Sequence, residues 1–108
     1  MSNLSTVDPI SREQVRDVVV PTLRPYATRI ELFGSVARGE STETSDIDLL
    51  LTLRAPENRP PLGLRWFELE QELSEQLGRP VELVTQRALS LHLRPHVTSD
   101  RVTLYEDE

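Results

Sequence analysis

The chain has 108 residues, of which 37% are hydrophobic and 28% charged, and its formal net charge at pH 7 is −6. This length fits one domain with a modest core. All twelve basic residues are arginine, which excludes a phosphate-loop lysine and a lysine nucleophile. The absence of cysteine excludes disulfides and thiolate metal sites. The acidic balance argues against general nucleic-acid binding, because cationic side chains supply most of that affinity.

The sequence also predicts where the protein works and how it is divided. No apolar run approaches the length that spans a bilayer, and no signal-peptide pattern opens the chain. Together with the lack of cysteine, these features predict a cytoplasmic protein. We expect residues 1–10 to form a flexible N-terminus, residues 11–106 a single domain, and residues 107–108 an acidic tail.

The first predicted element is a helix that begins near Ser11. Ser11 can cap its N-terminus while Gln14 reaches back, which is a capping box. Apolar residues then share one helical face, at Val15, Val18, Val19 and Leu23. Pro21 falls inside this pattern, so we expect the helix either to kink there or to end at Val20.

The remaining elements alternate between strands and helices. Residues 28–34 predict a short strand, and residues 46–53 predict a second that is buried on both faces, because its apolar run does not alternate. Regularly spaced apolar residues from Leu62 to Leu77 predict a helix that Gly78 and Pro80 end. Residues 81–85 predict a third strand, residues 86–97 a helix disturbed by Pro95, and residues 101–106 a last short strand. This order indicates α/β layering around one small sheet.

Two carboxylates stand inside the second strand. Asp46 and Asp48 are two residues apart, so they should project to the same side, roughly 6–7 Å apart. Two like charges on a half-buried surface repel each other unless a cation lies between them. Oxygen ligands without nearby histidine or cysteine favour Mg²⁺ or Mn²⁺. A capped helix start after Ser45 is the alternative, but the apolar run that follows lacks helical spacing.

A candidate phosphate site precedes these carboxylates. Gly34 permits a tight turn and close approach of a ligand to the backbone. Ser35 can cap a short helical turn whose free N–H groups suit an anion, and Arg38 can add a cation to the same place. The structural alternatives are that Ser35 is only a cap and that Arg38 is a solvated surface residue. A phosphate site beside two carboxylates describes a site for a metal–nucleoside triphosphate.

This pattern resembles a known superfamily. Gly34-Ser35, ten intervening residues and then Asp46-Ile47-Asp48 are similar to the signature of the DNA polymerase β-like nucleotidyltransferases. The stretches GSVARGE and SDIDLLL look particularly like the minimal nucleotidyltransferase (MNT) family, the antitoxins of HEPN/MNT toxin–antitoxin systems. The resemblance implies the nucleotidyltransferase fold, a small mixed β-sheet of three to four strands flanked by helices.

The resemblance also implies a reaction and assigns roles. It implies Mg²⁺-dependent (or Mn²⁺-dependent) transfer of AMP from ATP to a hydroxyl, in these systems a tyrosine of a cognate HEPN-domain toxin, so that the enzyme acts as an antitoxin in a hetero-oligomer. Gly34 and Ser35 match the phosphate-contacting pair, and Asp46 and Asp48 match the two metal carboxylates. The family's third catalytic and metal-binding carboxylate, usually Asp, falls on Glu82. The choice of ATP follows from the resemblance alone.

Glu82 departs from the family pattern. Glutamate is one methylene longer than aspartate, and a displacement of about 1 Å can lower a rate by roughly a hundredfold. Glu82 can serve with a shifted backbone, or it can be an exposed structural residue. His92 and His96 are four residues apart, which could suggest zinc, but Pro95 lies between them and no third ligand is evident.

Two other functions remain open at the level of sequence. One is a small-molecule enzyme like the aminoglycoside adenylyltransferases, although these carry an extra domain for the acceptor. The other is a catalytically weak antitoxin that neutralises its partner by binding, which the Glu82 replacement favours.

Overall fold

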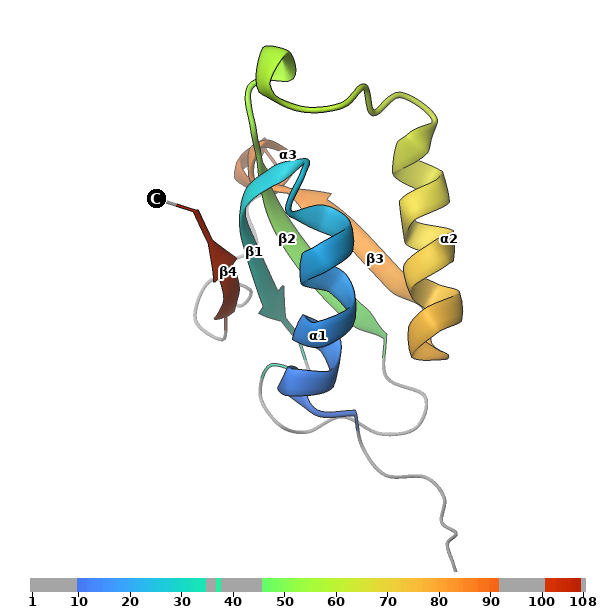
Figure 1. Cartoon of the computed structure of the whole chain (residues 1–108). Coiled ribbons are helices and arrows are strands. Elements are labelled where there is room, and N and C mark those ends of the chain that lie inside the picture. The colour runs from blue at the N-terminus through green and yellow to red at the C-terminus, as the bar shows by residue number, and fades with distance from the viewer. Residues whose placement is uncertain (1–9, 35–36, 38–45, 92–100, 108) are drawn as a thin grey trace, which may run out of the picture.

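A computed structural model describes residues 10–34, 37, 46–91 and 101–107, with the backbone alone for 89–91. These residues form a mixed four-stranded sheet flanked by helices (Figure 1). Within the described ranges, no helix is long and apolar enough to span a membrane.

The sheet has the strand order β3-β2-β1-β4. Strand β1 (Ala27–Phe33) pairs antiparallel with β2 (Ile47–Leu53) and with β4 (Val102–Glu106), whereas β2 pairs parallel with β3 (Val81–Thr85). All four strands were predicted to within one residue at each end. The predicted α/β class with a small mixed sheet is therefore confirmed.

Helix α1 (Arg12–Leu23) begins with the predicted capping box. The backbone N–H of Gln14 donates to Ser11 Oγ at 3.1 Å, and the backbone N–H of Ser11 donates to Gln14 Oε1 at 2.8 Å. The expected alternative of an end at Val20 is wrong, because the helix continues through Pro21 to Leu23. Pro21 removes the N–H that would bond to the Asp17 carbonyl, and burial of Val19 and Leu23 in the core keeps this last turn helical.

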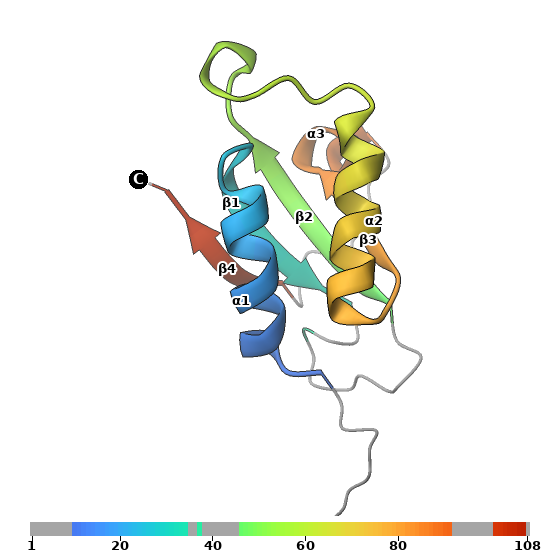
Figure 2. The same cartoon turned by 45° about the vertical axis from the view of Figure 1, so that its right-hand side comes forward.

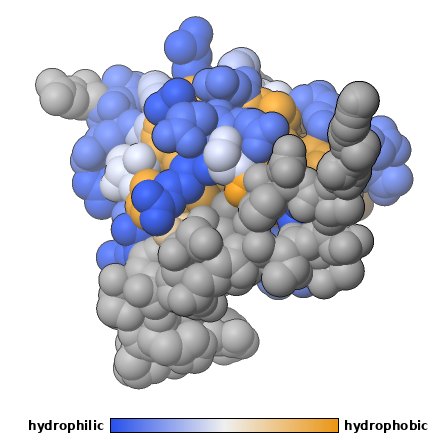
Figure 3. All heavy atoms as spheres, turned by 90° about the horizontal axis from the view of Figure 1, so that it is seen from below, coloured by the Kyte–Doolittle hydropathy of each residue, from blue (hydrophilic) through white to orange (hydrophobic). Residues whose placement is uncertain are grey.

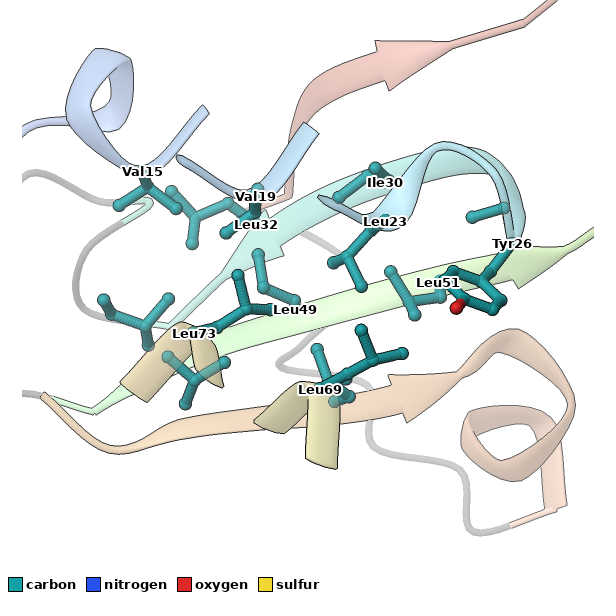
Figure 4. Close-up of a cluster of buried hydrophobic side chains, with 14 of the residues drawn as sticks. Val15, Val19, Leu23, Tyr26, Ile30, Leu32, Leu49, Leu51, Leu69 and Leu73 are labelled. Atoms are coloured by element: carbon teal, nitrogen blue, oxygen red, sulfur yellow. The ribbon is translucent and has the colours of Figure 1, made fainter. Parts of the chain in front are cut away.

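Helix α2 (Arg65–Leu77) follows a short 3-10 turn, η1 (Pro56–Asn58), and ends as predicted at Gly78, which has φ +69°. Figures 1 and 2 show α1 and α2 side by side on one face of the sheet. Their apolar residues meet those of β1 and β2 in one core (Figure 4), which includes Val15, Val19, Leu23, Ile30, Leu32, Leu49, Leu51, Leu69 and Leu73. Burial of this face on the sheet is the main stabilising contribution.

The outer edge of β3 is closed by side chains of α2. The backbone N–H of Val81 donates to Ser74 Oγ and that of Leu83 donates to Glu70 Oε2, both at 2.9 Å. These bonds satisfy groups that an edge strand otherwise leaves free for another chain. Helix α3 (Gln86–Leu91) then follows β3 directly and contacts β2 and β3. The rest of the helix predicted over 86–97 lies outside the described residues.

Candidate functional site

Three strands bring the predicted carboxylates to one end of the sheet. Strand β1 ends at Phe33, while β2 and β3 begin at this same end, drawn at the bottom of Figure 1. Asp48 stands opposite Phe33 on one side and opposite Glu82 on the other. The register therefore places Asp48 and Glu82 as direct cross-strand neighbours, although 34 positions separate them in sequence.

Both carboxylates occupy the face of the sheet that turns away from α1 and α2. Ile47 and Leu49, the residues on either side of Asp48, are fully buried in the helix-covered core, so Asp48 points the opposite way. Glu82 is exposed between buried Val81 and Leu83. Viewed from this end, the described surface is mostly hydrophilic (Figure 3).

Gly34 is required by the position of Asp48. Gly34 has φ +83°, and a Cβ built on it would lie 2.7 Å from Asp48 Oδ2. Any other residue would meet both the backbone strain of the left-handed region and a clash with the carboxylate. The chain thus leaves β1 with bare backbone against the acid. Close approach of a ligand at this turn stays a prediction.

Acidic neighbours and burial act together on Asp48. Desolvation raises the pKa of Asp48 to about 6, with further upward contributions from the charges of Glu82 and Asp46 and from a hydrogen bond with Glu82. Asp46 directly precedes β2 and is exposed. A bound cation would lower the repulsion between these negatively charged carboxylates.

The donor set fits a hard divalent ion in chemistry but is not preassembled. Asp46, Asp48 and Glu82 offer carboxylate oxygens alone, which Mg²⁺ and Mn²⁺ prefer. Among the described residues, however, no three acidic, histidine or cysteine side chains are already gathered at metal-binding distances. Ligand binding would therefore have to draw at least one of the three carboxylates inward.

Other predicted site residues lie outside the described ranges. These are Ser35 and Arg38; His92 and His96, which the sequence did not favour as zinc ligands, lie outside the described ranges as well. Ala37, between the first two, is described and is 2% exposed. The side chain of Arg12 donates a hydrogen bond to the Ala37 carbonyl. This contact ties the turn after Gly34 to the first residue of α1, and the sequence analysis did not anticipate it.

A second acidic residue on this face was also missed. Glu31 of β1 has a side chain only 8% exposed, and its one ion-pair partner in the described chain is Arg101, 3.5 Å away. The sequence carried no clear signal for Glu31. Arg29, Ile30, Glu31 and Leu32 alternate between polar and apolar, as in an ordinary strand with one exposed face.

Comparisons with known sequences agree with this geometry. The model of the nucleotidyltransferase domain family matches residues 13–104. A relative from Methanocaldococcus jannaschii, provisionally named protein adenylyltransferase MJ1215, is 34% identical over 90 residues, which cover 82% of this chain and 95% of that protein. Another from the same organism, provisionally named protein adenylyltransferase MJ1379, is 43% identical over 60 residues, 56% of this chain. That match spans 58% of the relative's own length.

Solved structures show the same fold. A toxin–antitoxin complex with AMP-PNP contains a chain that is 27% identical with a TM-score of 0.69, covering 86% of this chain and 74% of that one. A structure of the tri-AMPylated HEPN toxin of Shewanella oneidensis in complex with MNT antitoxin also contains a similar chain. That chain is 25% identical with a TM-score of 0.63, and the match covers 87% of this chain and 71% of that one.

Proposed function

Because the chain belongs to the nucleotidyltransferase domain family, we propose that it transfers AMP from ATP to a tyrosine hydroxyl of a HEPN-domain toxin and so acts as an antitoxin. The observation that carries this proposal is the placement of Asp48 directly opposite Glu82 and against the bare backbone of Gly34. That arrangement puts acids where a polyphosphate can approach the main chain. The relatives named as adenylyltransferases and the AMPylated complex support the choice of AMP and of a protein acceptor.

The reaction follows from the position of these groups. The acceptor oxygen forms a bond to the α-phosphorus of ATP, the bond from that phosphorus to the bridging oxygen breaks, and pyrophosphate leaves. Glu82 is exposed beside Asp48 and can take the proton of the attacking hydroxyl. Ser35 and Arg38 are proposed to hold the β- and γ-phosphates beyond Gly34.

Asp46, Asp48 and Glu82 are the residues that would hold Mg²⁺. When bound, the ion supplies positive charge to the α-phosphate and to the departing pyrophosphate. The protein contributes by fixing Asp48 on a rigid strand and by leaving Asp46 and Glu82 at its exposed end. Burial first, and then the charges of Glu82 and Asp46, raise the pKa of Asp48, and a cation held by these residues would favour the charged form of this acid.

The test is transfer of label from α-labelled ATP to a candidate HEPN-domain partner protein. We expect label on the partner in the presence of Mg²⁺, loss of label when the metal is chelated, and loss of both transfer and neutralisation in Asp48→Asn. The matched control is Glu57→Gln, which changes an exposed acid on η1 at the opposite end of the sheet (Figure 1). Its transfer rate should equal that of the wild type.

Two results would redirect the assignment. If Asp48→Asn still neutralised the toxin fully, binding alone would account for the antitoxin role and the chemistry would be secondary. If wild-type protein labelled aminoglycosides and no protein, the small-molecule alternative would replace the proposal.

A further inference from the structure

Glu31 is a buried carboxylate that the proposed chemistry does not use. Its side chain is 8% exposed, and its Oε1 atom is buried without a hydrogen-bond partner. Among the described residues its one ion-pair partner is Arg101, whose Nη1 lies 3.5 Å from that oxygen, too far for a well-formed charge-assisted bond. Burial of an acid is costly unless it is well paired. A residue in this state commonly serves a function other than stability.

Strand register places Arg101 at the site. Val102, the first residue of β4, pairs with Leu32. Continuing that antiparallel register by one residue sets Arg101 beside Phe33, directly before Gly34. Leu32 and Val102 pack into the helix-covered core, so Arg101 projects to the opposite face, which also carries Asp48. The turn at Gly34 therefore has the acids of β2 on one side and Arg101 on the other.

Arg101 retains donors for a ligand. A guanidinium has five N–H donors, and the contact with Glu31 occupies at most one of its edges. Its side chain is 27% exposed, and within the described residues no other hydrogen bond or ion pair engages the guanidinium. Arg29, on the same pair of strands, differs: it is hydrogen-bonded to the carboxylate of Glu106 and belongs to the far end of the β1–β4 ladder.

We infer that Arg101 binds the triphosphate of ATP beside the Gly34 turn and that Glu31 is the positioning residue that holds its guanidinium on this face. This assignment rests on the proposed function, because it supplies that reaction's nucleotide with a cation from β4. A phosphate that displaces water from the open edge of the guanidinium gains two parallel N–H···O bonds, which lysine at this position could not reproduce.

A purely structural role makes a different prediction. If Arg101 served only to neutralise Glu31, then removing both charges together would leave no unpaired charge and would restore stability and nucleotide affinity alike. If Arg101 binds phosphate, the double variant regains stability but not affinity for the nucleotide. The pair Arg29 and Glu106 provides the matched control, since it also bridges β1 and β4.

The experiment is calorimetric titration of the full chain with Mg²⁺ and AMP-PNP, and separately with AMP, alongside the midpoint of thermal unfolding. For Arg101→Gln we expect AMP-PNP to bind about 10- to 100-fold more weakly, the range for loss of a charge-assisted contact, and AMP to change by less than about threefold. The double variant Glu31→Gln/Arg101→Gln should keep this loss while its unfolding midpoint returns to the wild-type value. Arg29→Gln should bind as the wild type does.

The outcomes separate this inference from the function on which it rests. Wild-type affinity for AMP-PNP in the double variant, or an equal loss for AMP and AMP-PNP, would overturn the role of Arg101 and leave the nucleotidyltransferase proposal standing. Failure of the wild-type protein to bind AMP-PNP at all would overturn the proposed function and this assignment with it. Arg101→Lys tests the geometry of the contact. If this variant bound AMP-PNP as tightly as the wild type, the two parallel N–H···O bonds from the guanidinium to phosphate would be contradicted.

Discussion

The two faces of the central sheet are built from the same strands, but one forms the hydrophobic core and the other carries the acidic residues of the candidate site. The face under α1 and α2 is apolar throughout, with Leu49 and Leu51 among its fully buried residues. The opposite face carries Glu31, Asp48 and Glu82, beside a small apolar cluster around Leu50. Since neighbouring residues of a strand point to opposite sides, stability and chemistry are separated by single steps along the chain. Changes one residue apart should therefore have unrelated consequences.

The largest effect on stability is expected on the helix-covered face. Leu49→Ala removes a fully buried side chain from the core and should lower the free energy of unfolding by about 2–5 kcal/mol, measured by denaturant titration. Glu82→Gln, on the adjacent strand but on the other face, should change it by less than about 0.5 kcal/mol, since Glu82 is exposed. In the transfer assay the order of the two effects reverses. Glu82→Gln should lose more activity than Leu49→Ala, although the Glu82→Gln protein stays folded. Equal destabilisation by the two changes would contradict the separation of the faces.

The next effect lies at Gly34, where the two faces meet at the end of β1. Gly34→Ala combines the cost of φ +83° with a contact of 2.7 Å to Asp48 Oδ2, and should lower stability by about 2–3 kcal/mol. Gly78→Ala is the matched control, because Gly78 has φ +69° and nothing lies within 4 Å of its added Cβ. It should cost about 1 kcal/mol, the backbone part alone. If both substitutions had the same cost, Asp48 would not press on the Gly34 backbone.

Most of the fold could be predicted from sequence, because the local sequence signals for most elements were not overridden by tertiary packing. The capping box at Ser11, the glycine stop at Gly78 and the apolar runs of the strands each specify one element. Pro21 is the exception. Packing of Val19 and Leu23 in the core continues the helix past the proline, a tertiary effect that residue spacing does not reveal.

The site was predicted only as far as its motif reached. Asp46, Asp48 and Gly34 lie close in sequence, and Glu82 was assigned from the family resemblance, whereas its register opposite Asp48 came from the structure. The contacts of Glu31 with Arg101 and of Arg12 with Ala37 join residues far apart in the chain, and no local pattern predicts such pairs. The alternation of polar and apolar residues in β1 does not single out Glu31, and its partner depends on which strand becomes the neighbour of β1.

The smallest predicted effect concerns pH and compares Asp48 with an acid on the outside of α1. The pKa of Asp48 is raised to about 6 by burial and by its acidic neighbours, whereas an unfolded aspartate has a pKa near about 3.9. Folding therefore takes up a proton at Asp48, and the stability that this gives is present below pH ~4 and lost as the pH rises through about 6. Asp48→Asn lacks this dependence.

Because Asp48 is partly exposed, we expect the wild type to lose only about 1 kcal/mol relative to Asp48→Asn between pH 4 and pH 7 without metal, measured by denaturant titration. Asp17→Asn, an exposed position on α1, should leave the curve of the wild type unchanged. Parallel curves for wild type and Asp48→Asn would mean that the open face does not crowd its acids, and the need for a cation there would disappear.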